Sequence, residues 1–128
     1  MAFNDSFGKI THQNGEDPEE FILLYRTLLQ WTRQVLPDVK FIICQPYGFL
    51  CEKVEALTQD VIDEIREIGE RLKHLAEEFD AVYVPFFDVL EEKIQESDRA
   101  YYLRDAVHPT PAGHALLANT WLEAVENS

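Results

Sequence analysis

Cysteine is scarce in this chain. Its 128 residues contain two cysteines, Cys44 and Cys51. Two cysteines are too few for the disulfide framework of a small secreted domain, and no companion ligands around them indicate a metal site. Cys44 ends the apolar run 41–44, so it is predicted to be a small buried core residue, whereas Cys51 is expected in a loop. A disulfide between the two is not expected.

Positively charged residues are also scarce, because 11 Lys and Arg stand against 24 Asp and Glu, for a net charge of −13. A phosphate backbone repels such a surface, which excludes nucleic-acid binding and makes anionic membranes equally poor partners. No apolar run approaches the roughly 18–20 residues that a membrane-spanning helix needs. No secretory signal is visible, and the localisation stays open with the cytoplasm as the default.

What the sequence does contain is a globular composition, with 46% hydrophobic and 12% aromatic residues. The hydrophobic periodicity predicts alternating strands and helices. The predicted helices cover 18–36, 58–79, 86–95 and 112–125, and the predicted strands cover 40–45 and 81–85. This alternation predicts a single α/β domain over residues 1–128, with a parallel sheet between layers of flanking helices.

The first predicted helix has a clear start, with Asp17 as the N-cap, Pro18 at the first helical position and Glu20 three residues after the cap. Six apolar residues along this helix are spaced for one buried face. They are Phe21, Leu24, Tyr25, Leu28, Trp31 and Val35.

The strongest chemical signal is the tetrapeptide Asp105-Ala-Val-His108, which directly precedes the last helix. An Asp three residues before a His can accept a hydrogen bond from one imidazole nitrogen. That bond fixes the tautomer and leaves the other nitrogen free as a general base. Thr110 is a good N-cap and Pro111 suits the first helical position, so the pair is expected in a loop held rigidly against a docked helix.

The segment 105–114, Asp-Ala-Val-His-Pro-Thr-Pro-Ala-Gly-His, resembles the last conserved block of the SGNH hydrolases, also called GDSL-type esterases and lipases. Asn4-Asp5 resembles the end of the family's Gly-x-Asn-Asp block, and the segment 36–46 resembles the helix end and strand that come after it. The resemblance implies the three-layer, flavodoxin-like SGNH fold and hydrolysis of a small carboxylic ester. It also implies a serine nucleophile with Asp105 and His108, an oxyanion hole that includes Asn4, and no cofactor or metal.

The chain departs from the family pattern at its start. The family's Gly-Asp-Ser block, which holds the nucleophile, and its oxyanion glycine block both precede the Asn block, and neither is found here. The chain has three serines. Ser128 is the last residue, and Ser97 lies in a polar run with no strand before it. Ser6 is the only serine in a context similar to the nucleophile block, because Asn4-Asp5-Ser6 could be a degenerate Gly-Asp-Ser. The residues after it match the family's segment downstream of the Asn block, so Ser6 is predicted to be a loop or capping serine.

The sequence therefore predicts the C-terminal part of an SGNH hydrolase domain that lacks its nucleophile. The alternative is a non-catalytic α/β remnant that acts as a binding or assembly module. The remaining histidines give weaker signals, and His114 is expected to cap or pack the last helix rather than to act in catalysis.

The resemblance also implies that the N-terminal strands of the family's sheet are missing here. Their absence would leave one sheet edge and some apolar helix faces uncovered. We therefore expect the chain to self-associate or to pair with a missing N-terminal segment.

Overall fold

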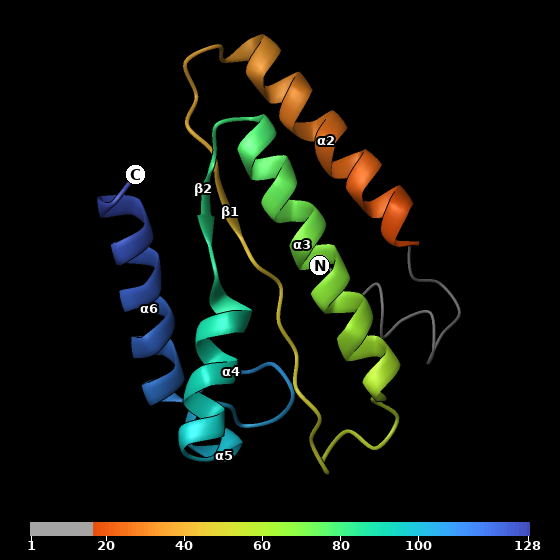
Figure 1. The fold of residues 1–128 in the computed structure, drawn as a ribbon, viewed down its shortest axis with the longest axis vertical. Helices are drawn as coiled ribbons and strands as arrows, with labels where there is room; N and C mark the ends of the chain where they lie inside the picture. The colour runs from red at the N-terminus through yellow and green to blue at the C-terminus, as the bar shows by residue number, and fades with distance from the viewer. Residues whose placement is uncertain (1–16) are drawn as a thin grey trace.

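The computed structural model describes residues 17–128, and these fold into five helices around a small parallel sheet (Figure 1). In chain order the elements are α2 (Pro18–Val35), β1 (Ile42–Cys44), α3 (Gln59–Glu78), β2 (Val82–Val84), α4 (Phe86–Glu96), α5 (Arg99–Tyr102) and α6 (Pro111–Glu126). The six elements predicted from periodicity are confirmed within a few residues. The short helix α5 was not predicted.

The sheet described between residues 17 and 128 has two strands, β1 and β2, which run parallel. Ile42 pairs with Val82 and Cys44 with Val84, and α3 forms the crossover between the strands. Figure 1 shows α2 and α3 on one side of the strands and α6 on the other. The predicted α/β class with a parallel sheet and flanking helices is confirmed. None of the helices described here is both long and apolar enough to cross a bilayer.

Helix α3 contributes to both hydrophobic clusters of the core. Its second half packs with α2 and β1 around Ile43, and its first half packs around Phe87 of α4. The apolar residues of this helix are spaced for one buried face, and that face is buried. Its buried members are Val61, Ile62, Ile65, Ile68, Leu72, Leu75 and Ala76. A long stripe can be buried along its whole length because α3 has neighbours at both ends.

The face predicted to be buried on α2 is right for Phe21 and for Tyr25, which packs against the core, and wrong for the other four members. The buried residues are Phe21, Ile22 and Leu29, which contact the α3 side of the core. Four members of the predicted stripe are exposed: Leu24, Leu28, Trp31 and Val35. Among the described elements α3 is the main neighbour of α2, and one neighbouring helix covers only a narrow part of a helix circumference. The apolar surface of α2 is therefore wider than the part of it that α3 covers.

The prediction that Cys44 is a buried core residue is also wrong. Cys44 is exposed and Cys51 is buried, and both are free thiols. Ile42 and Cys44 point to the sheet face opposite Ile43, where Ile42 is 38% exposed. Helix α6 lies over β2 and leaves this part of β1 uncovered. The prediction assumed a strand covered on both faces, as is usual in parallel sheets.

The start of α6 is fixed by a cap and by close packing. The Thr110 hydroxyl accepts a hydrogen bond from the Gly113 N–H at 3.2 Å and donates to the Tyr101 carbonyl at 2.6 Å. Pro111 occupies the first turn, as predicted. A Cβ at position 113 would collide with the carbonyl oxygen of Tyr102. Glycine is therefore required here because the helix and the preceding loop touch.

Gly113→Ala is expected to lower stability. In an unobstructed helix this change stabilises by about 1 kcal/mol, but here the new methyl meets backbone, and such overpacking typically costs about 1–3 kcal/mol. Urea unfolding monitored by circular dichroism measures the net effect. Asn119→Ala, on an exposed part of the same helix, is the matched control and should be neutral or slightly stabilising. A stabilised Gly113→Ala protein would contradict the packing described here.

Candidate functional site

The loop 103–110 lies against the segment that follows β1. The Phe49 N–H donates to the Ala106 carbonyl at 3.0 Å, and the Tyr47 hydroxyl donates to the Val107 carbonyl at 3.0 Å. Burial, together with the charge of Asp105, raises the pKa of Tyr47, so its phenol stays protonated as a donor. The loop therefore meets the carboxyl end of β1, which is where α/β sheets commonly build their sites.

Asp105 and His108 meet as predicted. One carboxylate oxygen of Asp105 lies 2.8 Å from Nδ1 of His108. The other oxygen accepts hydrogen bonds from the backbone N–H groups of Val107 and His108, both at 2.9 Å. An ionised carboxylate only accepts hydrogen bonds, so Nδ1 carries a proton, and in the neutral ring Nε2 is then the nitrogen with the lone pair.

The electrostatics of Asp105 follow from these contacts. Burial by itself raises the pKa of the carboxyl, but the N–H groups of Val107 and His108 and the ring of His108 outweigh it and lower the pKa to about 2. Asp105 is therefore ionised at neutral pH. Its side chain is 31% exposed and that of His108 is 73% exposed, so the ring is accessible to a reactant while the carboxylate is partly sheltered.

Further hydrogen bonds to backbone groups of the loop 103–110 hold its conformation. The Arg104 N–H donates to the His108 carbonyl at 2.8 Å. One guanidinium nitrogen of Arg99 donates to the carbonyls of Leu103 and Asp105, each at 2.9 Å, and its side chain is only 14% exposed. Lys53 donates to the Arg104 carbonyl at 3.0 Å. Sequence reasoning missed Tyr47, Lys53 and Arg99 because these contacts depend on tertiary proximity and no local pattern signals them.

The predicted oxyanion residue Asn4 and the serine candidate Ser6 lie outside the described residues. The other two serines make local contacts. The Ser97 N–H bonds the Ile94 carbonyl at the end of α4, and the Ser128 hydroxyl bonds the Val125 carbonyl at 2.6 Å. Neither is bonded to His108 in the part of the chain that the structure describes.

The expectation that the His114 side chain packs or caps α6 is wrong. His114 is exposed, and the α6 cap is formed by Thr110. Across residues 17–128, no group of three or more His, Cys, Asp or Glu side chains is placed to hold a metal ion.

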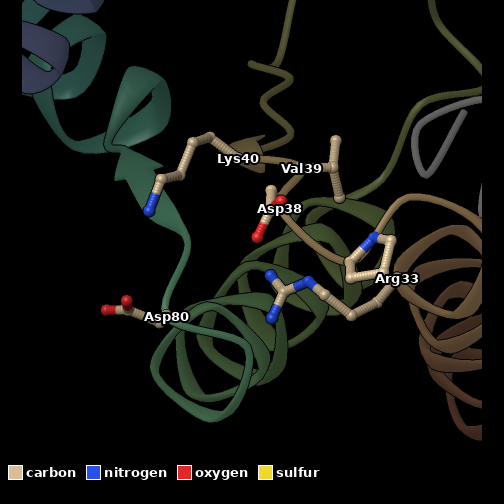
Figure 2. Close-up of a pocket in the computed structure, with 6 residues that line it drawn as sticks. Arg33, Asp38, Val39, Lys40 and Asp80 are labelled. Atoms are coloured by element: carbon tan, nitrogen blue, oxygen red, sulfur yellow. The ribbon is translucent and has the colours of Figure 1, made fainter.

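A polar depression on the surface lies at the opposite end of the sheet (Figure 2). It is lined by Arg33, Pro37, Asp38, Val39, Lys40 and Asp80. Lys40 and Asp80 precede β1 and β2, so this depression is at the amino ends of the strands. Arg33 is used structurally, because it donates to the Phe79 carbonyl at 2.9 Å and lies 4.7 Å from the centre of the Phe41 ring. The depression is separate from the Asp105–His108 pair.

The profile of the GDSL-like lipase/acylhydrolase family matches residues 3–116. No curated protein sequence matches the chain.

Several solved structures share the fold. One is a protein from Parabacteroides merdae ATCC 43184 described as a GDSL-like lipase, with 27% identity, a TM-score of 0.80, and coverage of 98% of this chain and 57% of that one. An acetylxylan esterase from Geobacillus stearothermophilus has 22% identity and a TM-score of 0.80, with coverage of 96% and 55%. The chain thus spans a little over half the length of these solved proteins. Two further structures of that esterase are described as catalytic mutants, one with a serine and one with an aspartate replaced by alanine.

The lowered pKa of Asp105 can be tested by titration. Carboxyl carbon NMR should give a pKa of about 2, against an ordinary value of 3.8. His108→Ala removes the ring bond, so the Asp105 pKa should rise toward 3.8. Because the folded-state pKa is the lower one, the interaction stabilises the fold above the ordinary pKa and loses this contribution as the pH falls toward 2. Titration near 3.8 in both proteins would contradict the geometry.

Arg99→Met is expected to loosen the loop. The change leaves two carbonyls without their charged donor, and hydrogen bonds to charged groups are worth about 1.5–3 kcal/mol. Urea unfolding should show that loss, and the amide protons of Val107 and His108 should exchange faster. Lys53→Met removes one bond from an exposed lysine and serves as the control, with a smaller effect on both. Equal effects of the two variants would show that Arg99 has no special role in holding the loop.

Proposed function

Because the chain belongs to the GDSL-like lipase/acylhydrolase family, we propose that residues 105–108 are the acid and base of a site that hydrolyses a small carboxylic ester. One observation carries this proposal. The Asp105 carboxylate holds Nδ1 of His108 at 2.8 Å while the ring stays 73% exposed. A base oriented in this way and left accessible is what a serine hydrolase needs.

The proposed chemistry assigns one step to each group. Nε2 of His108 takes the proton from a serine hydroxyl as the oxygen attacks the ester carbonyl carbon. It then gives that proton to the departing alcohol, and water releases the acyl group by the same route. Asp105 stabilises the imidazolium that forms between these steps. Asn4 would donate its amide to the developing oxyanion, an interaction whose loss typically costs about 10²–10³ in rate. These steps require no metal or organic cofactor.

We further propose that this chain does not supply the nucleophile. The Ser128 hydroxyl donates to the Val125 carbonyl, and Ser97 follows the last turn of α4, where its backbone N–H bonds the Ile94 carbonyl. Ser6 follows the Asn4-Asp5 pair that resembles a later block of the family. Because the chain covers 57% and 55% of the two solved relatives, 43–45% of their own length stays unmatched. The serine hydroxyl would come from polypeptide that corresponds to this unmatched part of the relatives. In the Geobacillus esterase, a serine and an aspartate are the residues changed in the structures described as catalytic mutants. This agrees with a site that needs a serine in addition to an acid such as Asp105.

The substrate is proposed only as a class, a carboxylic ester. The acyl and alcohol groups that fit depend on the shape of the pocket around the reacting atoms, and fold similarity does not transfer a substrate.

A second candidate function is a non-catalytic binding or assembly module. The exposed apolar stripe of α2 favours it, because an apolar stripe of that length on a globular domain usually marks a contact surface.

Two measurements on the 128-residue chain separate these proposals. Hydrolysis of p-nitrophenyl acetate should be slow but faster than in His108→Ala and Asp105→Asn. The ratio of the hydrolysis rates should be well below the roughly 10²–10⁴-fold that a positioned acid–base group typically contributes. Equal rates in all three proteins would mean that the Asp105–His108 pair does no acid–base chemistry in this chain by itself.

The absence of a nucleophile is tested with a fluorophosphonate, which labels activated serines. We expect no labelling of the chain. Stoichiometric labelling of Ser6, Ser97 or Ser128 that disappears in His108→Ala would show that the nucleophile lies in this chain after all. Lys73→Ala, a change on the exposed surface of α3, controls for nonspecific effects of substitution.

A further inference from the structure

Two consecutive peptide units of the loop point their N–H groups at one carboxylate oxygen. The N–H groups of Val107 and His108 donate to the same oxygen of Asp105, each at 2.9 Å. The other oxygen of Asp105 lies 2.8 Å from Nδ1 of His108. An N–H group can donate to a carboxylate only if its peptide plane is turned toward it. The orientation of the acid, and through it that of the imidazole, therefore depends on what fixes these two peptide planes.

The carbonyl ends of the same two peptide units are held by the segment that follows β1. The Ala106 carbonyl, which shares a peptide unit with the Val107 N–H, accepts a hydrogen bond from the Phe49 N–H at 3.0 Å. The Val107 carbonyl, which shares a peptide unit with the His108 N–H, accepts one from the Tyr47 hydroxyl at 3.0 Å. In a planar trans peptide the C=O and N–H groups point in opposite directions. Holding each carbonyl from one side therefore turns the N–H on the other side toward the carboxylate.

The two donors differ in kind. The donor of Phe49 is a backbone N–H, which every residue except proline supplies, whereas the donor of Tyr47 is a side-chain hydroxyl. We propose that Tyr47 is a positioning residue for the acid and the base, and that it acts by holding the peptide unit between Val107 and His108. The inference rests on the proposed hydrolase function and adds a residue to that site. Hydrogen bonds in such a series polarise one another, so the Tyr47 bond also strengthens the N–H bond to the carboxylate by about 10–30%.

The surroundings of Tyr47 suit this role. Tyr47 and Val107 both pack against the hydrophobic cluster that contains Ala106, which is 1% exposed. The hydroxyl is therefore held in place on a rigid part of the core. Burial and the nearby charge of Asp105 raise the pKa of the phenol, so it remains a hydrogen-bond donor throughout the neutral range.

Tyr47→Phe tests the inference by NMR, because it removes the hydroxyl and changes no charge. The His108 amide proton should move upfield, and it should exchange about two- to tenfold faster, the effect of losing one neutral hydrogen bond. The Val107 amide, whose peptide unit is held by Phe49, should change less. The pKa of Asp105 should rise from about 2 by roughly 0.2–0.5 pH unit, because its bond from the His108 N–H is weaker.

Tyr83→Phe is the matched control. The Tyr83 hydroxyl donates to the Gly69 carbonyl of α3, also at 3.0 Å, so this substitution removes the same kind of bond away from the loop. It should leave the His108 amide unchanged. Arg99 and Lys53, the charged side chains bonded to the loop, are the same in both variants.

Three NMR results would overturn the inference. The first is an unchanged His108 amide in Tyr47→Phe. The second is an equal change at Val107 and His108, which would mean that Tyr47 only holds the loop as a whole. The third is the same change in Tyr83→Phe.

Hydrolysis of p-nitrophenyl acetate separates this inference from the proposed function. The part of the rate that is lost in His108→Ala should also decrease in Tyr47→Phe, with KM unchanged, and should persist in Tyr83→Phe. Full retention of that part in Tyr47→Phe would overturn the role of Tyr47 in catalysis. A chain in which His108→Ala has no effect on the rate would instead contradict the proposed function, and the NMR signals would still decide whether Tyr47 positions the peptide.

Discussion

The carboxylate of Asp105 is the interaction on which the site depends. Its two oxygens take three hydrogen bonds, from two backbone N–H groups and from the ring of His108. The backbone bonds fix the shape of the tight turn, and the ring bond fixes the direction of the imidazole. The same contacts hold the carboxyl ionised, because they lower its pKa to about 2 despite its burial. Geometry and charge are thus set by one group, and Arg99 and Tyr47 hold the loop that carries it.

Local patterns predicted most of this architecture. The capped start of α6, with Thr110 and Pro111, is visible in the sequence because caps are local. The buried stripe of α3 was predictable for a different reason, since α3 is covered along its whole length and its periodicity reports its environment directly. The Asp105–His108 bond was also predictable, because both residues belong to one turn.

The predictions that were wrong concern which surfaces are covered by neighbouring elements. Four apolar residues of α2 and Cys44 of β1 were expected inside because their neighbourhood is apolar, yet they are exposed in the described part of the chain. Burial depends on what lies next to an element, and no local pattern reports that. The contact of Lys53 was missed for the same reason, as it joins residues 51 positions apart. The mismatch between apolar sequence and exposure is itself informative, because it identifies apolar surface that none of residues 17–128 covers.

We infer that Asp105 holds the neutral ring of His108 as the tautomer with its proton on Nδ1 and its lone pair on Nε2. Long-range ¹H–¹⁵N correlation NMR of His108, with the ring neutral, measures this directly. We expect a protonated Nδ1 and an unprotonated Nε2 for His108, with a mixture of tautomers once Asp105 is changed to Asn. A neutral ring of His108 with its proton on Nε2, or a mixture already present with Asp105 intact, would contradict it.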